Sequence, residues 1–377
     1  MADSPGARWA LLLCLPLAAC SAETADLAPL DWQRVDGPGP GGSVLGLGSA
    51  GAFDERGNFT VRAFLDGSVY RLYYGGSDAS DPTGNGSCPG INGTHWRIGT
   101  AESADGLTWT RVAGSATGGA VLDNGSATDF DSQITYRPFV LKDGSLYRMW
   151  FNGSTKFFNC PTGTRADNRR IGYAESSDGV AWTKLYDGGG PGGSVLPLGG
   201  AGAIDEQQVG YVWVLQDGPE YKMYYSANDA SNNWRVGLAV SRDARSWTKV
   251  PGKLAGGAVL GLGAPGSLDG ACAYQPAVVK ERDQLYRMWY RGCSGASNAG
   301  PSGGSIGYAE SNDGITWVKI PQPGPAGAAL GAGPAGRFDA AGLTTPSVFR
   351  DAQGWVMYYA GFDPTGRFLT GVARARP

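Results

Sequence analysis

Short stretches of alternating apolar and polar residues dominate the chain. Residues 58–75, N-F-T-V-R-A-F-L-D-G-S-V-Y-R-L-Y-Y-G, alternate on both sides of a D-G pair. A period of two is typical of β-strands with one buried face, and D-G between two such stretches predicts a hairpin turn. No segment keeps a helical period over any length. The pattern therefore predicts an all-β fold with many turns.

A glycine-rich stretch that ends in aspartate occurs repeatedly. Its first copy, residues 46–55 (G-L-G-S-A-G-A-F-D-E), has the G-x-G-x-x-G spacing of dinucleotide-binding loops, but a strand follows it instead of a helix. Similar stretches stand at residues 197–206, 261–270 and 331–340. A phosphate-binding loop is used once, so we interpret the stretch as a repeat element.

Five copies of a longer repeat follow from aligning the aspartate after the glycines. The copies are 64 to 77 residues apart and place this residue at Asp54, Asp131, Asp205, Asp269 and Asp339. In each copy two strands flank a turn, a third strand follows a variable loop, and a fourth follows the motif S-x-D-G-x-x-W. Five copies of four strands predict a five-bladed β-propeller that forms one domain over residues 30–377.

The fifth copy ends at residues 370–377, where its third strand is expected, and has no fourth strand. Residues 30–35 (L-D-W-Q-R-V) match residues 107–112 (L-T-W-T-R-V), the fourth strand of the first copy. We therefore expect the N-terminal strand to complete the last blade and close the ring, which removes exposed sheet edges.

The S-x-D-G-x-x-W motif occurs at residues 103–109, 176–182 and 311–317, and in degraded form at 241–247. Its aspartate can accept backbone N–H bonds in a tight turn, its glycine permits positive φ, and its tryptophan can pack between blades. We interpret the motif as structural. It resembles the Asp-box of sialidases, shortened by one residue.

The N-terminus has the features of a secretory signal. Arg8 precedes an apolar run that is too short to span a membrane and that ends in L-A-A-C, residues 17–20. This ending resembles the bacterial lipobox, which predicts a signal peptide over residues 1–19, acylation of Cys20 and a tether over residues 20–29. An ordinary signal peptide is the alternative. Either one predicts a location in the cell envelope or outside the cell, with membrane attachment only through a lipid.

Composition and cysteines limit the partners. The net charge of −3 provides no basic stripe, so nucleic acid is not an expected partner. Cys272 and Cys293 flank one hairpin and are predicted to form a disulfide. Cys88 and Cys160 occupy equivalent loops of consecutive repeats and are candidates for a second one. The single histidine, His95, argues against a multi-histidine metal site. No cofactor is expected apart from a structural calcium ion, and the chain is expected to be monomeric.

The repeat resembles the five-bladed propellers of the arabinanase, levansucrase and invertase superfamily of glycoside hydrolases. The resemblance is carried by the Y-x-M-W-Y second strands, the I-G-Y-A-x-S-x-D-G-x-x-W blade ends and the terminal closure. It implies cleavage or transfer of glycosidic bonds by carboxylates at the mouth of the central funnel, as in hydrolases that use one acid and one base or nucleophile.

The catalytic residues of that superfamily are not at their usual place. An aspartate commonly precedes the proline that opens the innermost strand, but the residues here are Thr60, Arg137, Tyr211, Gln275 and Thr345. The five repeated aspartates remain as candidates. Either they are turn caps or braces between blades, as their regular repetition favours, or Asp54, Asp131 and Asp205 form an acid/base set or bind a cation.

Residues near the strand starts and variable loops form a candidate saccharide-binding set of aromatic faces and polar donors. The set is Arg137, Tyr136, Tyr274, Gln275, Trp96, Trp234, Arg235 and Asn152.

Three functions are compatible with the sequence. The first is a glycoside hydrolase anchored in the cell envelope. The second is a non-catalytic propeller that binds a carbohydrate or a protein. The third is a sialidase-like enzyme with Arg62, Arg137 and Arg235 on the funnel axis. Two converging carboxylates in the funnel would favour an enzyme, whereas an apolar or filled channel would favour binding.

Overall fold

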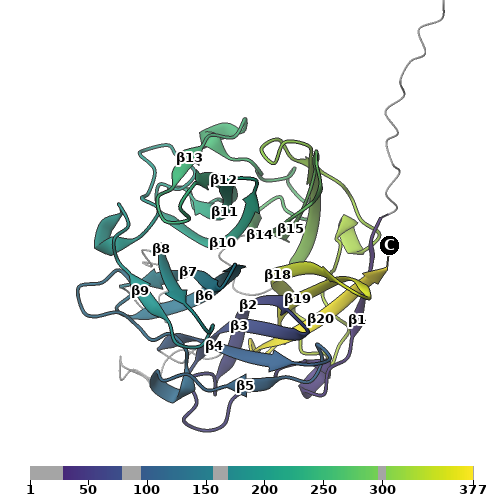
Figure 1. The fold of residues 1–377 in the computed structure, drawn as a ribbon. Helices are drawn as coiled ribbons and strands as arrows, with labels where there is room; N and C mark the ends of the chain where they lie inside the picture. The colour runs from purple at the N-terminus through teal and green to yellow at the C-terminus, as the bar shows by residue number, and fades with distance from the viewer. Residues whose placement is uncertain (1–28, 79–94, 156–168, 296–302, 377) are drawn as a thin grey trace, which may run out of the picture.

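The computed structural model describes residues 29–78, 95–155, 169–295 and 303–376, and the chain in these ranges is almost entirely strand and turn (Figure 1). Its regular elements are twenty β-strands and five three-residue 3-10 helices. Within the same ranges no helix has both the length and the apolar character needed to cross a membrane. The predicted all-β class is confirmed.

The strands form five units of four, in which consecutive strands pair antiparallel. Unit 1 contains β2 (Gly57–Asp66), β3 (Val69–Ser77), β4 (Trp96–Ser103) and β5 (Thr110–Val112). Unit 2 contains β6 (Ile134–Asp143), β7 (Leu146–Ser154), β8 (Arg170–Ser176) and β9 (Thr183–Leu185). Unit 3 contains β10 (Gln208–Asp217), β11 (Glu220–Asn228), β12 (Trp234–Ser241) and β13 (Thr248–Val250). Unit 4 contains β14 (Cys272–Arg282), β15 (Leu285–Cys293), β16 (Gly304–Ser311) and β17 (Val318–Lys319). Unit 5 contains β18 (Gly342–Asp351), β19 (Gly354–Phe362), β20 (Phe368–Arg376) and β1 (Asp31–Val35). The 3-10 helices are η1 (Pro40–Gly42), η2 (Thr117–Gly119), η3 (Pro191–Gly193), η4 (Ala255–Gly257) and η5 (Pro325–Gly327).

The units lie around a common axis with the first strand of each unit innermost (Figure 1). Units 1 and 2 are joined by one parallel contact between Trp96 and Ile134, and units 3 and 4 by one between Trp234 and Cys272. These single backbone bridges join units 1 and 2, and units 3 and 4, into two eight-stranded sheets, whereas unit 5 is a four-stranded sheet. Within each unit the four strands pair antiparallel, as they do in propeller blades.

Unit 5 is assembled from both ends of the chain. Strand β1 pairs antiparallel with β20 over five residue pairs, from Asp31 with Arg376 to Val35 with Val372. The predicted pairing of residues 30–35 with the C-terminal strand is therefore confirmed. The pairing covers the outer edge of β20, which would otherwise present unpaired backbone groups.

The tryptophan at the start of each outermost strand packs against the unit before it. Ring centroids of Trp109 and Tyr358 are 5.5 Å apart, and those of Trp32 and Trp289 are 5.9 Å apart, both edge to face. The other units make the same contact through the pairs Trp182–Tyr73, Trp247–Trp150 and Trp317–Tyr224. Edge-to-face pairs each add about 0.5–1.5 kcal/mol beyond area burial, so these contacts hold neighbouring units together.

The turns before these tryptophans have the predicted geometry. In the first copy Asp105 Oδ1 accepts hydrogen bonds of 2.8 Å from the N–H groups of both Leu107 and Thr108, and Gly106 has φ of 74°. In the degraded copy Ala244 takes the place of the glycine at φ of 65°. The structural interpretation of the motif is therefore confirmed.

The predicted disulfide between Cys272 and Cys293 is present, with Cα atoms 5.0 Å apart at paired positions of β14 and β15. It lies in a buried cluster with Trp234 and Tyr274. Cys20, Cys88 and Cys160 fall outside the described residues.

Candidate functional site

The innermost strand of every unit carries a β-bulge near its start. The register with the second strand shifts between Phe59 and Arg62 in unit 1, and equivalent shifts occur in all the other units. The residue in each bulge has positive φ although none is glycine: Thr60 57°, Arg137 57°, Tyr211 45°, Gln275 56° and Thr345 48°. Positive φ costs a residue with a Cβ about 1 kcal/mol or more, and such strain tends to collect at functional sites. These are the residues that stand where the superfamily commonly has aspartate.

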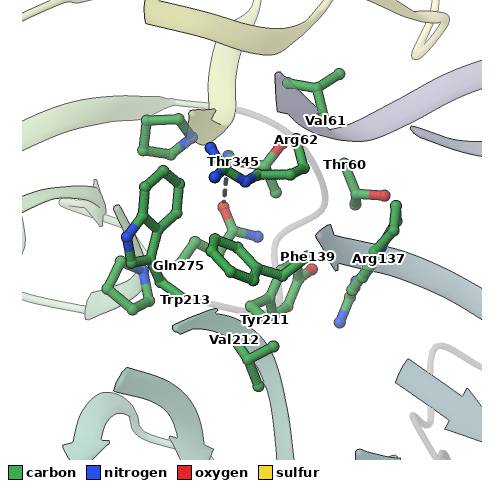
Figure 2. A pocket seen from close by; sticks show the side chains of 13 residues that line it. Thr60, Val61, Arg62, Arg137, Phe139, Tyr211, Val212, Trp213, Gln275 and Thr345 are labelled. Atoms are coloured by element: carbon green, nitrogen blue, oxygen red, sulfur yellow. Dashed lines mark hydrogen bonds between the residues drawn. The ribbon is translucent and has the colours of Figure 1, made fainter. Parts of the chain in front are cut away.

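The bulges surround one pocket on the axis of the five units (Figure 2). The bulge residue of every unit lines it, together with the next one or two residues of each strand. The lining is Thr60, Val61, Arg62, Arg137, Pro138, Phe139, Tyr211, Val212, Trp213, Gln275, Pro276, Thr345 and Pro346. Since every unit contributes side chains, the pocket exists only when the units are assembled.

Three bulge residues direct polar groups into the pocket. Thr60, Gln275 and Thr345 are 8%, 3% and 8% exposed. Thr60 Oγ1, Gln275 Nε2 and Thr345 Oγ1 are buried and have no hydrogen-bond partner within the protein. Buried polar atoms normally have partners. These three atoms therefore lack a hydrogen-bond partner that a bound molecule could provide.

The orientation of the Gln275 amide is fixed by its neighbours. Its Oε1 accepts hydrogen bonds from Thr345 N–H at 2.9 Å and from Thr344 Oγ1 at 2.5 Å. Because a backbone N–H can only donate, this atom of Gln275 must be the oxygen, and the amide nitrogen must be the group without a partner. Gln275 therefore offers two N–H donors to the pocket.

Arg62 forms part of the inner wall and is 8% exposed. Its Cζ lies 4.5 Å from the ring centroid of Phe139 and 4.7 Å from that of Trp213, so its guanidinium is stacked among aromatic rings. Its Nε donates to Val140 O at 3.1 Å and its Nη1 donates to Ala63 O at 2.8 Å. Burial lowers the pKa of Arg62 to about 9. Both of these hydrogen bonds go to backbone carbonyls, and within the described part of the chain no carboxylate forms an ion pair with Arg62.

Side chains between units hold the bulges in different ways around the ring. Tyr211 N–H donates to Asn152 Oδ1 at 2.8 Å, and Gln275 N–H donates to Ser226 Oγ at 2.9 Å. The positions equivalent to Asn152 and Ser226 in units 1 and 5 are Gly75 and Ala360, which have no side-chain acceptor. The pocket is thus built on a repeated backbone but loses the symmetry of the repeat in its side chains.

Among the described residues that line the pocket, none is aspartate or glutamate. The guanidinium of Arg62 and the rings of Phe139 and Trp213 stack together in the wall of the pocket. Glycoside hydrolysis by the usual route needs two carboxyl groups about 5–10 Å apart. The described lining therefore does not supply that pair, which favours binding over hydrolysis among the functions compatible with the sequence.

The five repeated aspartates lie elsewhere, each buried against a basic group. Asp54, Asp131 and Asp205 are 0%, 0% and 2% exposed. Their side chains pair with Arg111 at 2.8 Å, Lys184 at 2.5 Å and Lys249 at 2.6 Å. Units 4 and 5 repeat the contact with Asp269–Lys319 at 2.5 Å and Asp339–Arg34 at 2.7 Å.

A tyrosine hydroxyl completes each of these ion pairs. It donates to Asp54 from Tyr74 at 3.0 Å and to Asp205 from Tyr225 at 3.1 Å. In unit 2 the second-strand tyrosine is replaced by Phe151, and Tyr186 provides the hydroxyl at 3.2 Å from Asp131. We call this set of aspartate, basic residue and tyrosine the brace. Its repetition in all five units favours a structural role for Asp54, Asp131 and Asp205 over a catalytic one.

The saccharide-binding set predicted from the sequence is only partly brought together. Arg137 and Gln275 line the pocket. Trp96, Tyr136, Trp234 and Tyr274 are 6%, 1%, 1% and 4% exposed and pack in two aromatic clusters beside it. Their faces contact other aromatic rings, as in the edge-to-face pair of Trp96 and Tyr136 at 4.8 Å.

The other two members of the predicted set have structural partners. Asn152 is 1% exposed and holds Tyr211 in place, as described above. Arg235 forms an ion pair of 2.6 Å with Asp229 and is not among the pocket residues, so it does not join Arg62 and Arg137 on the axis. In the described ranges no group of three or more His, Cys, Asp and Glu side chains is placed to hold a metal ion.

The residues that sequence reasoning underrated are those of the bulge. Thr60, Tyr211 and Thr345 were recognised only as occupying the place of a missing aspartate, and Phe139 and Trp213 had no assigned role. The signal that could have found them is their alignment in the repeat, where Arg137, Gln275 and Thr345 each stand directly before a proline and Thr60 and Tyr211 occupy the same position. In all five units the residue at this position lines the pocket.

Comparison with curated proteins identifies a relative. The chain is 30% identical over 277 residues to the uncharacterized protein Rv1502 of Mycobacterium tuberculosis strain H37Rv, and the match covers 69% of this chain and 74% of the relative. No protein-family model matches the chain.

Solved structures with the same fold are glycoside-hydrolase propellers. One, described as a glycoside hydrolase, has a TM-score of 0.65 and 17% identity and covers 91% of this chain and 93% of its own. Another comes from a study of the GH130 family of mannoside phosphorylases, with hydrolases that target β-1,2 mannosidic linkages in Candida mannan; it has a TM-score of 0.61 and 16% identity and covers 93% and 98%. At these identities the likeness establishes a glycoside-hydrolase-like propeller fold and nothing finer.

Proposed function

Because this chain belongs to the family of the uncharacterized Mycobacterium tuberculosis protein Rv1502 and has a glycoside-hydrolase-like propeller fold, we propose that it is a carbohydrate-binding propeller whose ligand occupies the axial pocket. The observation that carries the proposal is the pocket lining. It combines aromatic rings with hydrogen-bond donors and, among described residues, contains no carboxylate. Such a lining suits recognition of a sugar better than cleavage of a glycosidic bond.

The proposal includes the assembly and location expected from the sequence. The five units are the blades of a single closed propeller over residues 30–377. The mature chain is held in the cell envelope by acylation of Cys20. Replacing Cys20 with alanine is expected to move the protein from the membrane fraction to the soluble fraction, and a protein that stays in the membrane fraction would contradict the anchor.

The function is tested with the chain from residue 21 onward and a panel of arabinans, xylans, fructans, mannans and pectins. Retention in affinity electrophoresis on one of these polymers, without release of reducing sugar, is the expected result. A Gln275→Leu protein should lose the retention, because it keeps the approximate volume of the side chain and removes both donors. An Arg242→Met protein is the control, since Arg242 has 84% of its side chain exposed.

Release of reducing sugar would support the hydrolase instead. In that case Asp54→Asn, Asp131→Asn and Asp205→Asn proteins would show whether a brace residue is the acid. Asp81→Asn and Asp167→Asn proteins would test two acids of the segments 79–94 and 156–168, which lie outside the described residues. Activity lost in one of these folded variants would refute the binding function.

A further inference from the structure

The polar groups that reach the axial pocket are unevenly divided between donors and acceptors. The fixed amide of Gln275 presents N–H groups, because its oxygen is already occupied by Thr344 and Thr345. Thr60 and Thr345 add hydroxyl groups that can donate. Arg62, which also lines the pocket, has a side chain that can only donate. The pocket therefore offers many donors and few acceptors.

Arg62 adds a charge that no carboxylate of the described residues balances. Buried charges are normally paired with an opposite charge, because an unpaired charge in a dry interior is costly. The side chain is more than nine-tenths buried, and its hydrogen bonds described above go to two carbonyl groups. Its guanidinium stacks on the rings of Phe139 and Trp213. The carboxylates of the braces do not serve it, because each of them is paired with a basic residue of its own. A negatively charged ligand group in the pocket would provide the missing opposite charge.

The shape of the donors matches a planar anionic group. A guanidinium and a primary amide both present N–H groups in a plane, and a carboxylate can accept from two such groups at once. The bulge backbones are held at positive φ in all five units, and neighbouring units hold three of them through Asn152, Ser226 and Gln275. The donors are therefore positioned before a ligand arrives, which reduces the entropy lost on binding.

We propose that the axial pocket binds the carboxylate group of an acidic sugar residue, so that this protein selects uronate-containing glycans over neutral ones. This inference rests on the proposed function, since it specifies which class of carbohydrate the pocket takes. Arg62 supplies the charge, Gln275 and the threonine hydroxyls supply neutral donors, and Pro276, Pro346 and Val212 supply apolar contacts for the sugar ring. No covalent step is involved.

The test is calorimetric titration of the chain from residue 21 onward with matched acidic and neutral sugars. D-glucuronate is compared with D-glucose and D-glucuronamide, and D-galacturonate with D-galactose. At least one uronate is expected to bind about tenfold or more tightly than its neutral counterparts, which is the effect of one charge-assisted contact. Inorganic phosphate is titrated separately. Phosphate that binds as tightly as the uronates would overturn the proposal, because it would indicate a simple anion site.

Variants of the pocket test which residues make the distinction. Arg62→Met is expected to remove the preference for the uronate, and Gln275→Glu to abolish uronate binding by placing a like charge beside it. Arg242→Met is the control and should behave as the unchanged protein. If Arg62→Met fails to fold, as judged by near-UV circular dichroism, the Gln275→Glu protein and the comparison of uronates with neutral sugars still test the proposal.

Two results separate this inference from the proposed function. Retention on a neutral polymer with equal affinity for uronate and neutral sugar would overturn the inference and leave the carbohydrate-binding function standing. Absence of binding to every polymer and every sugar would overturn both. A preference for uronate that persists in both folded pocket variants would also overturn the inference, because another part of the protein would then recognise the carboxylate.

Discussion

The brace and the bulge occupy fixed positions in the same repeat, and they differ in how strictly their residues repeat. The brace keeps aspartate in all five units, with a lysine or arginine and a tyrosine hydroxyl beside it. The bulge keeps its backbone conformation but carries Thr60, Arg137, Tyr211, Gln275 and Thr345. A device that holds five equivalent sheets together should repeat, whereas recognition of one asymmetric ligand should not. We therefore expect the brace to provide stability and the bulge to select the ligand of the proposed function.

The largest expected effect comes from removing the strand on which one brace depends. Deletion of residues 30–35 removes β1, and with it Trp32 and Arg34, the partners of Trp289 and Asp339. The outer edge of β20 is then exposed. We expect loss of the cooperative unfolding transition in urea. Deletion of residues 21–28 is the control. An unchanged transition after deletion of residues 30–35 would refute closure of the propeller by β1.

A brace substitution should reduce stability without changing ligand affinity in the protein that remains folded. Asp131→Ala leaves Lys184, whose side chain is 12% exposed, without its ion-pair partner. Burial lowers the pKa of Lys184, and the charge of Asp131 opposes that shift, so removing Asp131 lowers the pKa further. Breaking a buried pair costs about 3–5 kcal/mol of unfolding free energy.

The matched control for the brace is Asp36→Ala. Asp36 pairs with Arg337 at 2.6 Å but has 71% of its side chain exposed, so its loss should cost less than about 1 kcal/mol. Urea denaturation measures both variants. Equal losses in the two, or a loss of sugar affinity in folded Asp131→Ala, would remove the distinction between brace and bulge.

A rise in pH should weaken ligand binding at the bulge through Arg62. Arg62 has a pKa of about 9 because of burial, so it loses its proton and its charge as pH rises through that value. Uronate affinity should fall by about tenfold between pH 7 and pH 10, and the bound carboxylate should shift the midpoint upward by favouring the charged form. Arg137 and Tyr211 also line the pocket, so D-glucose is titrated over the same range as a neutral reference. A uronate affinity that stays constant would contradict the role of Arg62.

The smallest effect is expected at the turn motif, which belongs to neither region. Hydrogen bonds from Thr108 N–H, Leu107 N–H and the Ser103 hydroxyl lower the pKa of Asp105 to about 2. A lowered carboxyl pKa adds stability above the ordinary value near 4 that is lost as pH falls from about 4 to about 2. Because Asp105 is exposed, Asp105→Ala should cost at most about 1 kcal/mol at pH 7. The difference from the unchanged protein should disappear at pH 2, as measured by thermal unfolding. A difference that persists there would show that the charge is not responsible.

The regular parts of this molecule could be predicted because they recur. Alternation gave the strands, the aspartate spacing gave the repeat, and the match of residues 30–35 with 107–112 gave the pairing of β1 with β20. Hairpin geometry likewise placed Cys272 opposite Cys293. Each of these inferences used local chemistry that is repeated several times along the chain.

The pocket could not be predicted in the same way, because it depends on backbone conformation. Nothing in the residue type of Arg137 or Tyr211 indicates positive φ, which turns each bulge residue toward the axis. Trp96 and Trp234 were expected to present their faces to a sugar, but neighbouring rings cover them. Whether an aromatic residue near a loop is a binding surface or a packing surface depends on contacts from other units, and those contacts are remote in sequence.

Because β1 pairs with β20, unit 5 can be completed only after β20 has been synthesised. Trp32 pairs with Ala375, so β1 cannot find its partner until more than 340 further residues have been made. Contacts this far apart in sequence slow folding, because a long loop has to close before they contribute. A chain released from the ribosome before residue 368 lacks β20, leaving both β1 and β19 with unpaired edges. Products that end before β20 should therefore be more open to proteolysis than products that contain it.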